Sequence, residues 1–242
     1  MSLQRSLKTI RNNQFRLITP FTQSRSIALV RGERLRGAIR DPEEYLTVKN
    51  HRYGVTEDNL KYIKNYLTKV ENGKFLIPDD LLLQVITHKS FAHGSKPYNE
   101  KLSVIGFQLL KYYTSFYSIS SPTNSKFAIN NLNFDCLGSL VSKFIIHEEC
   151  LAKFIKSKNI NQIIFWKKAS PLDEDPRTNG ENAVYSKVTS ALVGAINLFH
   201  GTTKAQEFIK EELLDNQEAS LVKTAVELSK EFLSGREKNK IN

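Results

Sequence analysis

Beyond residue 55 the chain alternates runs of apolar residues at helical spacing with short polar breaks. The clearest run follows Thr56, a good N-cap residue, and two acids that suit the positive end of a helix. Its apolar positions are Leu60, Ile63, Leu67 and Val70. Asn72 and Gly73 then interrupt the pattern, so the sequence predicts a helix over about 57–71.

The same spacing predicts helices through the rest of the chain, and Pro78 marks the start of one. The others are predicted at about 99–118, 133–146, 147–157, 182–200 and 217–234. One more helix is predicted to begin at Thr203. Their expected buried stripes are Leu102, Ile105, Leu109 and Tyr113; then Val184, Val188, Leu192, Ala195 and Phe199; and finally Leu221, Ala225, Leu228 and Phe232.

One polar stretch precedes these helices and another lies between two of them. Residues 41–55 are expected to form an irregular, extended connector, and the Ser, Pro and Asn content of 118–131 predicts a loop. No segment shows convincing strand alternation, so the predicted fold is all-α. A chain of 242 residues is expected to form one domain with extensions.

Residues 87–110 read THKSFAHGSKPYNEKLSVIGFQLL and resemble the ribonuclease III signature. The positions that carry the resemblance are Thr87, His88, Ser90, Asn99, Glu100, Leu102, Gly106 and Leu110. The resemblance implies two catalytic carboxylates at 103 and 107, where this chain has Ser103 and Phe107. Both positions lie off the predicted buried stripe. Residues four apart share a helix face, so carboxylates there would converge on one metal ion.

A second segment, SKVTSALVGAINLFH at 186–200, resembles the closing helix of the same family. The match runs through Ala191, Leu192, Gly194, Ala195 and Ile196. The resemblance implies an acidic pair at 187 and 190, where the chain has Lys187 and Ser190. A serine hydroxyl is a poor Mg²⁺ ligand and an ammonium repels the metal, so the resemblance predicts a ribonuclease fold that has lost its catalysis.

Other acids could in principle compensate. Glu100 survives, but the resemblance assigns it to the framework of the signature. The remaining candidates, Asp173, Glu174, Asp175 and Glu181, fall in a stretch with Pro, Asn and Gly and are expected to be solvated loop acids. No catalytic residue, metal site or cofactor is therefore predicted, although a nuclease with displaced carboxylates stays open as a second hypothesis.

Composition excludes several other classes of protein. No apolar run reaches the length that spans a bilayer. The two cysteines, Cys136 and Cys150, form neither a disulfide framework nor a zinc site, which indicates ordinary thiols in a reducing compartment.

The net charge of +10 is concentrated at one end. Residues 1–40 hold nine basic residues and one acid, whereas the remaining 202 residues hold 26 basic and 24 acidic groups. The first thirty residues lack acids and space their arginines among Ser, Thr and apolar residues, as mitochondrial presequences do. The other interpretation is a disordered basic arm that binds RNA. Both can hold, and the expected RNA-binding residues are Arg31, Arg34, Arg36 and Arg40.

A mitochondrial-type leader on a ribonuclease III fold without its metal ligands is similar to the ribonuclease III-like proteins of the fungal mitochondrial large ribosomal subunit. The resemblance implies a non-catalytic scaffold in the mitochondrial matrix that contacts large-subunit rRNA and other ribosomal proteins, and a heterodimer with a second ribonuclease III-like chain. The alternatives are a mitochondrial RNA-processing endoribonuclease or the inactive partner of one.

The expected divisions of the chain follow from these features. They are a presequence at 1–27, a basic extended arm at 28–55, a ribonuclease III-like domain at 56–215, and a C-terminal helix and tail at 216–242.

Overall fold

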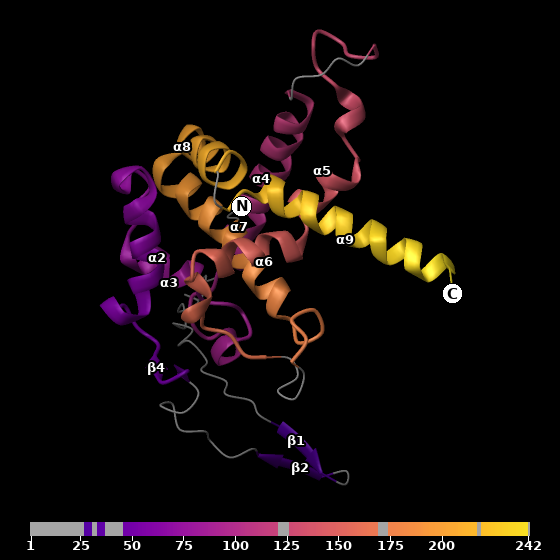
Figure 1. Ribbon diagram of the computed structural model, residues 1–242. Helices are drawn as coiled ribbons and strands as arrows, with labels where there is room; N and C mark the ends of the chain where they lie inside the picture. The colour runs from indigo at the N-terminus through magenta and orange to yellow at the C-terminus, as the bar shows by residue number, and fades with distance from the viewer. Residues whose placement is uncertain are drawn as a thin grey trace, which may run out of the picture. The chain divides into compact units, whose positions relative to one another are not determined.

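The structure is a computed structural model that describes residues 27–30, 33–36, 46–120, 126–168, 174–216 and 219–241. It comprises two compact units, Met1–Asp41 and Pro42–Asn242 (Figure 1). In the first unit, strand β1 (Ile27–Val30) pairs antiparallel with β2 (Glu33–Arg36). Apart from Ile27, the predicted presequence lies outside the described residues.

The second unit is helical, as predicted, and opens on a small hairpin. Strands β3 (Thr47–Val48) and β4 (His51–Arg52) pair within the segment predicted to be an irregular connector. Lys49 and Asn50 form its turn with φ of 49° and 66°. Strands of two residues leave no room for an alternating pattern, so the period that reveals longer strands is absent here.

The other regular elements described in this unit are helices. They are α2 (Glu57–Lys69), η1 (Val70–Gly73), α3 (Asp79–Val85), η2 (Phe91–Gly94), α4 (Glu100–Ser120), η3 (Phe134–Cys136), α5 (Leu140–Ile145), α6 (Glu148–Ser157), η4 (Ile160–Gln162), α7 (Glu181–His200), α8 (Thr202–Phe208), the π-helical η5 (Ile209–Leu214) and α9 (Leu221–Ile241).

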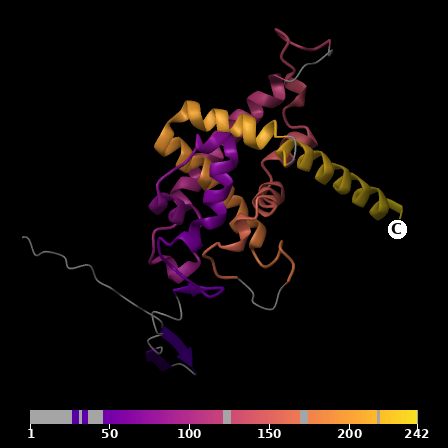
Figure 2. The ribbon, with the colours of Figure 1, turned by 60° about the vertical axis from the view of Figure 1, so that its left-hand side comes forward.

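Helix α7 forms the centre of the unit. Every residue from Val184 to Ile196 is buried except Lys187. Helices α3, α4, α6 and α8 all contact α7, and both ribbon views show it among its neighbours (Figures 1 and 2). Nearly all residues of its buried stretch are apolar or small, as expected for a helix that is covered on almost all sides.

The first predicted helix is confirmed. The side-chain oxygen of Thr56 accepts a hydrogen bond from the backbone N–H of Asn59 at 3.3 Å, and so caps α2. The four predicted apolar positions are all buried. The helix ends where Glu71, Asn72 and Gly73 adopt positive φ, conformations that the Asn-Gly pair tolerates well.

The predicted buried stripe of α4 is wrong at its centre. Ile105 is 44% exposed, whereas Ser103 is buried together with Leu102, Leu110 and Thr114. The covered face is centred on Gly106, against which the backbone of α7 packs. Close backbone contact selects a small residue, so a search for large apolar side chains missed the face that is actually buried.

Three smaller differences concern helix ends and stripes. The helix predicted at 133–146 is divided into η3 and α5, because Gly138 adopts a φ of 78° and Ser139 then caps α5 by accepting the N–H of Ser142 at 3.2 Å. Phe199 of α7 and Phe232 of α9, predicted to be buried, are exposed at the ends of their stripes. Helix α4 also runs to Ser120, beyond its predicted end.

Candidate functional site at the crossing of α4 and α7

The crossing of α4 and α7 depends on two glycines. A Cβ atom on Gly106 would overlap the carbonyl oxygen of Ser190 and lie 2.6 Å from the backbone nitrogen of Gly194. A Cβ atom on Gly194 would overlap the carbonyl oxygen of Leu102. The two helices therefore touch through their backbones, and this contact brings together the two sequence segments that carried the predicted site.

Ser103 and Ser190 are both buried at this crossing. The Ser103 hydroxyl donates to the carbonyl oxygen of Glu100 at 2.8 Å, and the Ser190 hydroxyl donates to that of Ser186 at 3.0 Å. Each hydroxyl thus satisfies its proton within its own helix. Neither side chain offers the negative charge that a divalent cation would need in a buried position.

Phe107 and Lys187 are half-buried on the same pair of helices. Burial is the largest cause that lowers the pKa of His88, which falls to about 4. The positive charges of Lys187 and Lys89 lower this pKa further, and the charge of Glu100 opposes them. The surroundings of His88 are therefore positive on balance, which is unfavourable for a metal cation.

His88 and Ser90 join two distant parts of the chain. The backbone N–H of Ser90 donates to Nδ1 of His88 at 3.2 Å, so Nδ1 carries no proton, and the Ser90 hydroxyl lies 3.0 Å from the same atom. The backbone N–H of Lys167 donates to Oγ of Ser90 at 3.0 Å, and that of His88 donates to the carbonyl of Phe165 at 2.8 Å. These contacts give His88 a structural role as a neutral imidazole.

Asn99 and Glu100 also contribute to the framework. Asn99 is fully buried; its side chain donates to the carbonyl of Val85 at 2.9 Å and its backbone N–H donates to Thr87 at 2.9 Å. Glu100 forms an ion pair with Lys89 at 3.2 Å. These bonds hold the start of α4 against the segment after α3, which explains why the signature contains polar residues that have no chemistry of their own.

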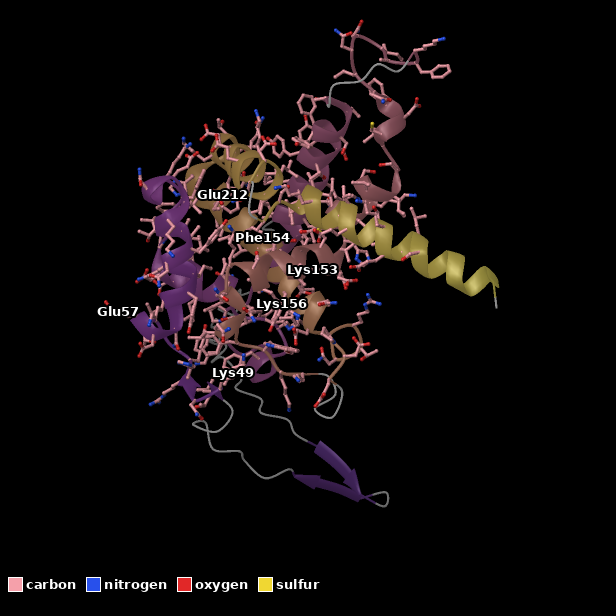
Figure 3. The ribbon with its side chains drawn as sticks, in the orientation of Figure 1. Lys49, Glu57, Lys153, Phe154, Lys156 and Glu212 are labelled. Carbon is pink, nitrogen blue, oxygen red and sulfur yellow. The ribbon has the colours of Figure 1, made fainter. Side chains whose placement is uncertain are left out.

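The other candidate acids are dispersed. Asp173 lies outside the described residues. Asp175 accepts the N–H of Arg177 at 3.0 Å within a turn. Glu181 was predicted to lie in a loop, but it is the first residue of α7. Its carboxylate forms an ion pair with Lys156 of α6 at 2.7 Å (Lys156 is labelled in Figure 3). Within the described parts of the chain, no group of three or more His, Cys, Asp or Glu side chains could hold a metal ion.

Cys136 and Cys150 are free thiols, half-buried and buried respectively. Burial raises the pKa of Cys150 to about 12, so this thiol stays protonated and unreactive near neutral pH. No helix in the described ranges is both long and apolar enough to cross a membrane.

The structure describes little of the predicted RNA-binding arm. Arg31 and Arg40 lie outside the described residues, and Arg34 and Arg36 belong to β2, for which only the backbone is described. Their assignment as RNA-binding residues stays a prediction.

Sequence reasoning missed two features of this region. It did not anticipate the bonds from His88 and Ser90 to residues 165–167, because no local pattern signals a contact across more than seventy positions. It also did not distinguish Gly106 and Gly194 as the contact between helices. Their occurrence within otherwise helical patterns was an available signal, since an interior glycine weakens a helix and often has a packing reason.

A protein-family model described as Ribonuclease-III-like matches residues 78–217. The protein named "Large ribosomal subunit protein mL57" of Neurospora crassa is 25% identical over 157 residues, which cover 60% of this chain and 57% of the relative. Its namesake in Schizosaccharomyces pombe is 25% identical over 172 residues, covering 69% and 75%. The chain thus spans little more than half the length of the Neurospora relative.

Bacterial ribonucleases are also similar. "Ribonuclease 3" of Corynebacterium diphtheriae is 31% identical over 144 residues, covering 55% of this chain and 50% of the relative. Among solved structures, the nuclease domain of ribonuclease III from Campylobacter jejuni aligns with a TM-score of 0.45 and 22% identity, covering 62% of this chain and 89% of that one.

Proposed function

Because the chain belongs to the ribonuclease-III-like family, we propose that it uses this fold as a structural constituent of the mitochondrial large ribosomal subunit, in the mitochondrial matrix. The observation that carries the proposal is the pair of fungal relatives named as large ribosomal subunit proteins, which match 60% and 69% of this chain. The acid-free crossing of α4 and α7 supports it, since a scaffold has no need of a metal.

The same crossing supports the loss of nuclease activity. Metal-assisted hydrolysis requires carboxylate oxygens that hold the ion and orient the attacking water. At the four positions that the resemblance assigns to these ligands, the chain has two buried hydroxyls, one aromatic ring and one ammonium, in Ser103, Ser190, Phe107 and Lys187. A cation placed there would lose its hydration without gaining a counter-charge.

The proposed partners follow from the charge and the surface. The chain beyond residue 40 is nearly neutral, so phosphate attraction alone gives it little hold on rRNA. The basic segment that contains Arg31, Arg34, Arg36 and Arg40 supplies the RNA contact, and packing against neighbouring ribosomal proteins supplies the rest.

One of those neighbours is a second ribonuclease III-like chain. Val104 and Ile105 of α4 expose apolar side chains beside the buried crossing, and Leu198 and Phe199 do so near the end of α7. Exposed apolar residues of this kind suit a helix-packed interface. A unique place in an asymmetric particle favours a heterodimer over a homodimer. Light scattering that finds a stable homodimer as the sole cellular form would contradict this part of the proposal.

A sucrose gradient of the tagged, full-length protein tests the proposal directly. The protein should sediment with the large mitochondrial ribosomal subunit and stay there through moderate salt. Its depletion should reduce the level of large subunits and mitochondrial translation before it affects transcript processing. Sedimentation with free proteins, or an earlier defect in RNA processing, would favour an RNA-processing role instead.

A further inference from the structure

The structure contains an apolar arm, which we define as the described residues between Tyr112 and Ser139. It comprises the last turns of α4, the turn that follows residue 126, and η3 (Figures 1 and 2). In both views the arm extends beyond the other helices of its unit. Its large exposed apolar side chains, each between 42% and 79% exposed, are Tyr112, Phe116, Phe127, Ile129, Phe134 and Leu137.

Backbone hydrogen bonds give the arm a defined conformation. Asn130 and Asn131 adopt φ of 50° and 63°, and Ile129 and Leu132 exchange N–H···O bonds of 3.1 and 2.9 Å across this tight turn. The N–H of Asn133 donates to the carbonyl of Ile119 at 3.0 Å, which ties the returning chain to the end of α4. Ile129 is therefore held at the turn with 63% of its surface exposed.

The charge of the arm narrows the class of ligand. Between residues 112 and 139 the sequence has one basic residue, Lys126, and one acid, Asp135, whereas a quarter of the whole chain is charged. Proteins that bind nucleic acid or anionic membrane surfaces place Lys and Arg beside their exposed aromatic residues. A net-neutral, aromatic-rich segment is instead suited to an apolar pocket of another protein.

We propose that the apolar arm inserts into a neutral, apolar pocket of a neighbouring protein that is not a second copy of this chain. Its four exposed aromatic rings alone offer about 500 Å² of surface for burial, at about 200 Å² per complete side chain. Stable protein pairs bury about 1,200–2,000 Å² in total. With an equal area on the partner, these rings account for about 1,000 Å² in total, somewhat below that range. Such an area suits one contact among several in a larger assembly better than a free binary complex.

This inference extends the proposed function by naming the chemistry of one contact, and a photo-crosslinker tests it. Benzoylphenylalanine is placed at position 129 of the tagged full-length protein, and intact mitochondria are irradiated. The matched control carries it at Val55, an exposed apolar residue in front of α2. We expect a discrete adduct from position 129 that survives ribonuclease and is destroyed by protease, and none of that size from position 55.

The partner must also depend on the chemistry of the arm. The same adduct should form when benzoylphenylalanine is placed at position 116. In that protein, Ile129→Asp should reduce the yield of the adduct by about tenfold or more, because binding would bury an unpaired carboxylate. Val55→Asp is the control substitution and should leave the yield unchanged. Because Ile129 is exposed, its variant should unfold at the same temperature as the wild type.

Several results would overturn the proposal. An adduct that is sensitive to ribonuclease, or one that contains lipid, would identify the wrong class of partner. An adduct that carries a second, differently tagged copy of this chain would identify self-association. The absence of an adduct from position 129, or a yield insensitive to Ile129→Asp, would also overturn it. The sucrose gradient tests the proposed function independently of the crosslink. A protein adduct on chains that sediment as free protein would retain the arm inference and reject the ribosomal role.

Discussion

Replacing Gly106 with alanine should destabilise the protein, although alanine is the better helix former. In an exposed helix this change gains about 0.8–1 kcal/mol. At the crossing of α4 and α7, however, the added methyl group would overlap the carbonyl oxygen of Ser190 and lie 2.6 Å from the nitrogen of Gly194. Both are backbone atoms, so no side-chain rotation relieves the overlap and the helices must move apart.

The cost of that movement outweighs the gain in helix propensity. Ordinary carbon contacts lie at about 3.5–4 Å, so the helices must separate by roughly an ångström or more along their contact. Overpacking typically costs about 1–3 kcal/mol, and separation of two backbones in a close-packed core belongs at the upper end. After the propensity gain is subtracted, we expect a net loss of about 2 kcal/mol, which lowers the Tm by about 4–8 °C for a chain of this size.

Thermal unfolding followed by far-UV circular dichroism measures this effect. The matched control is Gly235→Ala in α9, where an added Cβ atom would meet nothing within 4 Å. That variant should equal or slightly exceed the wild-type Tm, so the two identical substitutions should differ in sign. A Gly106→Ala protein as stable as the wild type would refute the account of the crossing as a backbone contact.

Three further predictions concern the leader, the chemistry and pH. The first forty residues, fused to a neutral reporter, should direct it into mitochondria, and changing Arg5, Arg11 and Arg16 to Glu should abolish import. The purified protein should not cleave double-stranded RNA with Mg²⁺ or Mn²⁺, and Ser103→Ala should leave respiration intact; chelator-sensitive cleavage would reject the non-enzymatic proposal. Folding lowers the pKa of His88 from 6.5 to about 4, so the unfolded chain binds more protons between these values. The stability contributed by neutral His88 is therefore complete above pH 6.5 and is lost as the pH falls toward 4. The Tm should fall over this range, and His88→Gln should make that fall smaller.

The sequence predicted most of the helices because their signals are local. Thr56, its following acids and the terminal Asn-Gly pair specified α2 nearly to the residue. The two-residue strands β3 and β4 gave no such signal, since they are shorter than one repeat of a recognisable pattern. Helix existence was therefore predictable where periodicity extends over several turns, and short pairings were not.

The candidate site was predictable in composition but not in geometry. The sequence alone shows that Ser103 and Lys187 are not acids, but it does not show which face of α4 is buried. A rule that counts large apolar side chains selected Ile105 and missed Gly106, because it assumes that helices pack through side chains. The positive surroundings of His88 also arise from Lys187, ninety-nine positions away in the sequence. No periodicity argument can supply such a contact.

The residues that make the family recognisable and those that perform metal chemistry have separate physical tasks. Gly106, Gly194 and Asn99 determine whether α4 and α7 can meet and how α4 begins, so replacing them costs folding free energy whatever the protein does. Residues 103 and 187 can change without disturbing those contacts, since a serine hydroxyl bonds to its own helix and a half-buried lysine can extend to solvent. A chain can therefore keep the fold and the motif frame of a nuclease while the metal ligands are absent. In such a chain, function has to be sought on the outer surface, where the exposed residues of α4 and of the apolar arm lie.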